Sequence, residues 1–167
     1  MSIVKLRAME PEDLDFLYNM ENDHEVWNVG NTNVPYSRYV LHDYIANATN
    51  DIYHDGQVRL IVENEEGKTV GMADVFDFNA QHRRAEISIV INRNYRQRGY
   101  AEAAITQIAE YSRRTLHLFQ LYAIVAENNN PSRRLFEKTG FKHAAKLEKW
   151  LFDGEKYENA IFLQRFL

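Results

Sequence analysis

The most constraining feature of the chain is a short basic segment between a strand-like run and a helix-like run. The segment reads Asn94-Tyr95-Arg96-Gln97-Arg98-Gly99-Tyr100-Ala101, after the apolar run 85–91 and before a helical pattern over 102–115. A helix start offers backbone N–H groups without an intrahelical partner and the positive end of the helix dipole. A glycine lets the backbone approach a bulky anion closely. The segment therefore predicts a phosphate-binding loop, with an ordinary turn carrying solvated arginines as the alternative.

Regular patterns of apolar residues predict the elements before this segment. Pro11 suits the first position of a helix, and the acidic residues after it complement the helix dipole. The segment 27–35 is predicted to be a loop, and the polar segment 47–57 is predicted to be mobile. In chain order, we predict a strand over 2–8, helices over 11–22 and 37–47, and antiparallel strands over 58–63, 68–78 and 83–91.

Beyond the basic segment and its helix, the pattern returns to strands. The strand over 119–126 is predicted to run parallel to 83–91, because a helix crosses between them. Asn130 and Pro131 are predicted to be the N-cap and first residue of a helix, with Gly140 just past its end. The remaining elements are that helix over 131–139 and strands over 144–151 and 158–166, joined by Asp153-Gly154.

This order of elements predicts one domain over residues 1–167. The expected fold class is α/β (α+β), with a mixed, mostly antiparallel central sheet flanked by helices. A content of 45% hydrophobic and 26% charged residues is typical of a globular domain.

The composition also excludes several classes of function. The chain has no cysteine, and its six histidines show no metal-ligand spacing, so no metal site is expected. The net charge of −4 argues against general nucleic-acid binding. We found neither a signal peptide nor an apolar stretch long enough to span a membrane, so we expect no membrane association and a cytoplasmic location.

Two motifs and the element order resemble the GNAT N-acetyltransferase family over most of the chain. Arg96-Gln97-Arg98-Gly99-Tyr100-Ala101 is similar to the family's acetyl-CoA loop, Gln/Arg-x-x-Gly-x-Gly/Ala, and the block 127–141 also resembles the family. Within the family, the segments 82–86 and 153–159 most resemble bacterial spermidine N-acetyltransferases. Ribosomal-protein N-terminal acetyltransferases are the nearest other relatives.

The resemblance implies acetyl-CoA as co-substrate and direct acetyl transfer to a primary amine in a ternary complex. Backbone N–H groups of the loop would bind the pyrophosphate, and the preceding strand would pair with the pantetheine arm. For Asn129 the resemblance implies a pantetheine contact, and the alternative is a simple loop residue before a capped helix. The implied cofactor-binding residues are Ile89, Val90, Ile91, Arg96, Gln97, Arg98, Gly99, Tyr100, Ala101, Asn129 and Phe136.

Phe136 stands where the family often has a tyrosine that protonates the departing thiolate. Phenylalanine has no proton to donate, so that role cannot be carried over. The thiolate then leaves without an acid, or another hydroxyl serves: Ser132, Tyr100 or Tyr122.

Glu86 is the candidate catalytic base. An amine with an ordinary pKa near ~10 must lose a proton before or as it attacks. The resemblance to spermidine-type relatives implies an active-site role for this glutamate, whereas the alternative is a strand carboxylate paired with Arg83 or Arg84. Asp74, Asp77 and Tyr122 are candidates to line the acceptor site, with solvated strand residues as the alternative.

Three functions remain open from the sequence. The first is acetylation of a small-molecule amine, with a polyamine such as spermidine as the expected substrate, although Asn31-Thr32-Asn33-Val34 lacks the acidic cluster of polyamine members. The second is acetylation of a protein N-terminus or lysine. The third is an acetyl-CoA-binding module with weak catalysis, motivated by Phe136. Polyamine relatives form large rings, so a homo-oligomer is also open.

Overall fold

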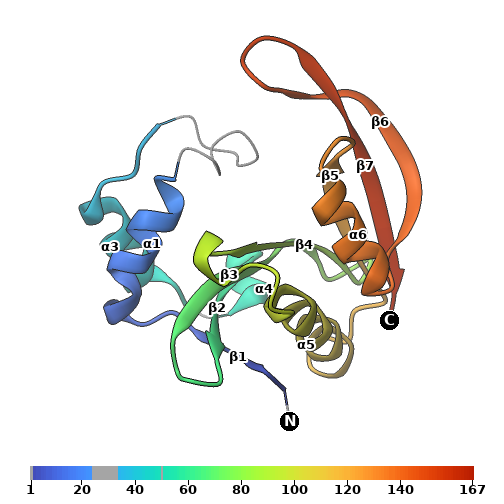
Figure 1. The fold of residues 1–167 in the computed structure, drawn as a ribbon. Helices are drawn as coiled ribbons and strands as arrows, with labels where there is room; N and C mark the ends of the chain where they lie inside the picture. Colours follow the sequence, from blue (N-terminus) through green and yellow to red (C-terminus); the bar gives the residue numbers. More distant parts are fainter. Residues whose placement is uncertain (1, 24–33, 50) are drawn as a thin grey trace.

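The computed structural model describes residues 2–23, 34–49 and 51–167. Most of the loop predicted over 27–35, including Asn31 to Asn33, therefore lies outside the described residues. Figure 1 shows a central twisted sheet with helices against both faces and a long hairpin, β6–β7, projecting from one end. The predicted fold class, a mixed and mostly antiparallel sheet flanked by helices, is confirmed.

The sheet has seven strands in the order β1-β2-β3-β4-β5-β7-β6. Only one neighbouring pair, β4 with β5, runs parallel, and the other pairs are antiparallel. The long α5 crossover between β4 and β5 explains this, as the sequence predicted. The bounds are β1 Val4–Ala8, β2 Val58–Asn64, β3 Thr69–Asn79, β4 Arg84–Ile91, β5 Gln120–Ala126, β6 Lys142–Phe152 and β7 Tyr157–Phe166.

Most helices lie close to where the sequence predicts them. Ser37 caps α3 by accepting a hydrogen bond from the Val40 N–H at 3.1 Å. The predicted helix over 11–22 begins as a 3₁₀ turn and becomes α-helical at Leu14. The bounds are η1 Pro11–Asp13, α1 Leu14–Glu21, α3 Arg38–Asn47, α4 Ile52–Asp55, η2 Arg93–Tyr95, α5 Tyr100–Arg114 and α6 Asn130–Lys138.

The local structure differs from the sequence predictions at two places. The polar segment 47–57, for which no helix or strand was predicted, contains α4, whose Ile52 is buried in the main core. Asp51 caps this short helix and Gly56 ends it in the left-handed conformation. The N-cap of α6 is Asn129 instead of Asn130, so Pro131 occupies the second helical position.

Each face of the sheet has its own hydrophobic core. On one face, α5 and α6 pack through Ile105, Ile108 and Phe136 against strand residues such as Leu121. On the other face, α1 and α3 pack through Leu17, Met20 and Leu41 against residues of β2 and β3, namely Ile61 and Met72. No helix in the described part of the chain is long and apolar enough to cross a membrane.

The parallel strands β4 and β5 pair over only three residues each. Arg84 to Glu86 pair with Gln120 to Tyr122, and the pairing then stops. The edge of β4 over residues 87–91 therefore has no β5 partner, although its other edge stays paired with β3. The predicted parallel pairing is confirmed, and Glu86 lies on its last paired rung.

Candidate active site

The loop between β4 and α5 presents a row of backbone donors. Gly99 is the N-cap of α5 with φ +80°, and Gln97 also has a positive φ of +61°. The first hydrogen bond of α5 runs from the Ala103 N–H to the Gly99 carbonyl at 3.1 Å. Within the described residues, the N–H groups from 97 to 102 make no hydrogen bond. Such a row at a helix start suits the oxygens of a pyrophosphate.

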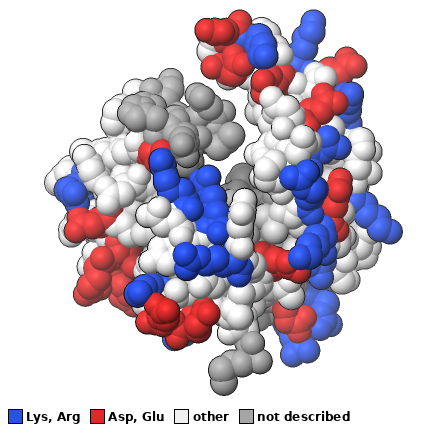
Figure 2. All heavy atoms as spheres, in the orientation of Figure 1, with Lys and Arg blue, Asp and Glu red and all other residues white. Residues whose placement is uncertain are grey.

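Basic side chains surround these donors. The Arg98 guanidinium lies 5.5 Å from the centroid of the Tyr95 ring, and both Arg96 and Arg98 are exposed. Arg96 is folded back, because its Nε donates to the Ile91 carbonyl at 3.1 Å. Figure 2 shows Lys and Arg side chains gathered over the start of α5 and over α6. The positive charge adds to the dipole of α5.

The unpaired edge of β4 continues from this loop. Ile89 and Ile91 turn their side chains to the core under α5, whereas Val90 packs against the α1–α3 core. At Gly71 of β3, an added Cβ would lie 2.4 Å from the Val90 carbonyl oxygen, so a glycine is needed for close packing of these strands. Residues 89–91 and the loop 96–101 thus follow one another along the end of β4 and the start of α5.

The two remaining predicted cofactor residues lie on α6 or at its start. The Asn129 side chain accepts a hydrogen bond from the Ser132 N–H at 3.3 Å, so it caps the helix. Phe136 is buried, at 5% exposure, with its ring edge-to-face against Phe141 at 5.1 Å between centroids. The Tyr100 side chain is also buried, at 7% exposure, beneath the start of α5.

Glu86 is a half-buried carboxylate without a partner. No hydrogen bond or ion pair reaches it from the described residues, and Arg83 donates instead to the His117 carbonyl at 2.7 Å. Burial, and secondarily the negative charge of Asp77, raise the pKa of Glu86 to about 7. A carboxylate with this pKa can exchange protons near neutral pH, as a general base requires.

The other acidic candidates differ in their surroundings. Asp77 accepts a hydrogen bond from the Tyr122 hydroxyl, and the Tyr122 ring stacks on Phe162 at 5.0 Å between centroids. Asp74 is instead in a two-point ion pair with Arg59, at 2.7 and 2.8 Å, and Arg59 also contacts Glu21. Asp77 and Tyr122 thus lie at the Glu86 rung, whereas Asp74 is engaged under α1.

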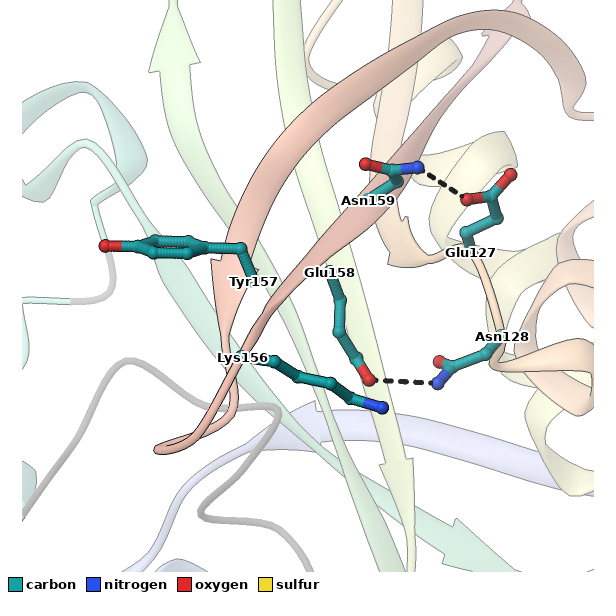
Figure 3. Close-up of a pocket in the computed structure, with 6 residues that line it drawn as sticks. All are labelled: Glu127, Asn128, Lys156, Tyr157, Glu158 and Asn159. Atoms are coloured by element: carbon teal, nitrogen blue, oxygen red, sulfur yellow. Dashed lines mark hydrogen bonds between the residues drawn. The ribbon is translucent and has the colours of Figure 1, made fainter.

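A pocket of about 410 Å³ opens beside the C-terminal end of β5 (Figure 3). Hydrogen bonds across it join Asn159 to Glu127 at 2.9 Å and Asn128 to Glu158 at 3.2 Å. The sequence assigned no role to these residues, although both segments fall in blocks that resemble the family. Only the pairing of β5 with β7 shows that they share a pocket. No group of three or more His, Asp or Glu side chains that could hold a metal ion occurs in 2–23, 34–49 and 51–167.

Comparison with known proteins shows the family to which the chain belongs. The family model described as an acetyltransferase (GNAT) domain matches residues 4–142. A spermidine N(1)-acetyltransferase of Escherichia coli is 31% identical over 95% of this chain and 83% of its own length. One from Vibrio cholerae is 28% identical over 95% of this chain and 90% of its own length.

Solved structures agree with this family assignment. The crystal structure of a Vibrio cholerae spermidine N-acetyltransferase in complex with CoA and spermine superposes with a TM-score of 0.85 at 26% identity. The match covers 98% of this chain and 95% of that one. The loop of unpartnered N–H groups, the unpaired β4 edge and these matches lead to one conclusion: the chain belongs to the GNAT acetyltransferase family and is an acetyl-CoA-dependent N-acetyltransferase.

Proposed function

We propose that the enzyme acetylates a small cationic amine of the polyamine class and that Glu86 is its general base. The observation that carries the proposal is the state of Glu86: half-buried, without a partner among the described residues, and on the last rung before β4 and β5 separate. The spermidine acetyltransferases among its relatives support the class of acceptor.

The residues of the loop fit a pyrophosphate. The N–H groups of 97–102 point their hydrogens to no partner in the described chain, and Gly99 holds the left-handed φ that opens the row. We assign the pyrophosphate to these groups, with Arg98 adding charge. The β4 edge over 89–91 offers its main-chain groups to the pantetheine arm. Bound acetyl-CoA supplies the activated acyl group.

Glu86 then takes the proton that the acceptor must lose. Its pKa of about 7 leaves a large fraction ionised at neutral pH, ready to accept a proton directly or through a water molecule. The acceptor nitrogen becomes nucleophilic only without that proton. The position of Glu86 at the separation of β4 and β5 puts this base at the inner end of the pantetheine edge.

Neither of the two candidate tyrosines, Tyr100 and Tyr122, is placed to supply the acid missing at Phe136. The Tyr122 hydroxyl already donates to Asp77, and the Tyr100 ring is buried. Ser132 lies in the first turn of α6, beside Asn129, and its hydroxyl makes no hydrogen bond within the described residues. We assign proton return to the thiolate to Ser132 or to solvent.

A panel of acceptors tests the proposed substrate class. Acetyl-CoA consumption is measured with spermidine, spermine, a fully N-blocked spermidine and peptides with free N-termini. We expect turnover with the two polyamines and background rates with the blocked compound. Faster turnover of the peptides would assign the enzyme to protein acetylation, and tight acetyl-CoA binding without any acetylation would leave a binding module.

A further inference from the structure

Glu86 lies in the middle of a row of side chains that crosses three strands. It pairs with Phe76 of β3 on one side and with Tyr122 of β5 on the other. Residues directly opposite each other in a sheet project to the same face. Glu86 and Tyr122 therefore share the face that carries Val90 and lies opposite the α5 core.

The Tyr122 side chain reaches across Glu86's own strand. Its hydroxyl donates to the carboxylate of Asp77, which belongs to β3, two strands away from β5. Neighbouring strands lie about 4.8 Å apart, so this side chain passes over β4 at the rung of Glu86. Stacking on Phe162 at an interplanar angle of 15° and an exposure of only 7% hold the Tyr122 ring in place.

A bulge in β3 turns Asp77 toward this face. The register shifts between Phe76 and Asn79, and Asp77 has a φ of +49°. In an unbroken strand, Asp77 would project to the face opposite Phe76 and Glu86. Bulges re-aim side chains in this way, and a left-handed non-glycine residue costs energy that surrounding contacts must offset. The Tyr122 hydrogen bond is such a contact.

We propose that Asp77 and Tyr122 are positioning residues for the base: the Tyr122 hydroxyl fixes the Asp77 carboxylate beside Glu86, so that a second negative charge faces the base from the β3 bulge. The proposal rests on the role of Glu86 as the base. It gives the β3 bulge and the Tyr122–Asp77 bond a function in the reaction, although neither residue has to touch the reacting atoms.

The charges around Glu86 agree with this assignment. Burial is the larger cause of the raised pKa of Glu86, and the negative charge of Asp77 is the second cause. Tyr122 stays neutral, because burial and its bond to Asp77 raise its pKa above the ordinary value. The positive charge of Arg84, on the same strand as Glu86, opposes this rise in the pKa of Tyr122. Asp74, further along β3, is already paired with Arg59. Asp77 has no ion pair within the described residues.

The test follows the ionisation of Glu86 in the free enzyme. The enzyme is labelled with ¹³C at glutamate side-chain carboxyls, and the Glu86 signal is identified by its loss in Glu86→Gln. Its midpoint is then measured in the wild type, in Asp77→Asn, in Tyr122→Phe and in Glu148→Gln. Glu148 is an exposed residue of β6 and serves as the control for removing one negative charge. Tyr122→Phe keeps the stacked ring.

We expect Asp77→Asn to move the Glu86 midpoint to lower pH, Tyr122→Phe to move it in the same direction by less, and Glu148→Gln to leave it in place. The acid limb of the kcat/KM profile, taken with the best acceptor, should move with the midpoint, so that both variants retain a several-fold larger share of their plateau activity at pH 6. Unchanged midpoints in both folded variants would overturn the proposal. Because the titration needs no acceptor, rejection of polyamines would sink the proposed substrate and leave this inference standing.

Discussion

Replacing Glu86 by glutamine should make the protein more stable and less active. Burial and Asp77 raise the pKa of Glu86 from 4.5 to about 7, so ionising this group in the folded state costs free energy. At about 1.36 kcal/mol for each pKa unit, full ionisation would cost about 3.4 kcal/mol. Glu86 is only half-buried, and discounting for solvent screening leaves about 1–2 kcal/mol.

The direction of the pH dependence follows from the raised pKa. Below its ordinary pKa of 4.5, Glu86 is protonated in both the folded and the unfolded state and costs nothing. Between that value and about 7 the unfolded state releases its proton first, so the wild type loses stability as pH rises. Glu86→Gln cannot ionise. It should match the wild type near pH 4 and exceed it by about 1–2 kcal/mol at pH 8.

Urea unfolding at pH 4.5 and pH 8 measures this difference directly. The control is Glu148→Gln, which removes the same charge from an exposed position on β6. The control should show less than about 0.5 kcal/mol at either pH, as expected for a surface substitution. Equal stabilities of Glu86→Gln and wild type at pH 8 would refute the buried, charge-loaded environment assigned to Glu86.

The same variant tests the chemistry. Loss of a general base lowers the rate about 10²–10⁴-fold, so kcat/KM at pH 7 should fall by at least about 10²-fold. The rising limb with a midpoint near 7 should disappear, and the loss should shrink above pH 9, where more of the amine is already neutral. A gain in stability with unchanged activity would leave Glu86 a buried carboxylate without a catalytic role.

Substitutions at two positions of the proposed donor site, Gly99 and Asn129, separate binding from folding. Gly99→Ala and Gly56→Ala each place a Cβ at a positive φ, +80° and +70° respectively, so each should lower the free energy of unfolding by about 1–2 kcal/mol. Only Gly99→Ala should also weaken acetyl-CoA binding, by about tenfold in calorimetry. Equal affinities of Gly99→Ala and Gly56→Ala for acetyl-CoA would show that the loop is not part of the donor site. Asn129→Ala removes the cap of α6 and should lower the free energy of unfolding by about 1 kcal/mol, measured by thermal unfolding. Asn129→Asp keeps the cap, so it should raise only the KM for acetyl-CoA if the amide N–H₂ contacts the donor.

The donor half of the site could be predicted because its parts are contiguous. Strand, loop and helix follow one another over 85–115, and local rules for helix starts and glycine suffice to place the backbone N–H groups. The helix α4 was missed because four residues are too short to show a hydrophobic period. The cap of α6 was misplaced by one residue, since Asn129 and Asn130 are equally good capping residues.

The acceptor half could not be predicted in the same way, because it depends on register. Asp77, Glu86 and Tyr122 come from three strands, and only the pairing of β3, β4 and β5 brings them to one rung. Strand parity puts Glu86 on the face opposite Ile87, which lies in the core under α5. Parity alone would put Asp77 on the wrong face, since the bulge after Phe76 reverses it. No pattern of residues in this segment signals that bulge.

The two halves of the site therefore respond differently to sequence change. The proposed donor loop would use main-chain N–H groups. Almost any residue type supplies these groups, as long as Gly99 keeps its left-handed φ. A chain 25–31% identical to its relatives can bind the same donor on that basis. The proposed base depends on side chains, and an uncharged replacement at Asp77 is expected to lower the pH at which Glu86 ionises. On this reasoning, the acceptor range and the pH response of such enzymes can diverge while acetyl-CoA binding stays the same. In this chain, substitutions at Asp77 and Tyr122 are the first ones to make in order to change the pH response.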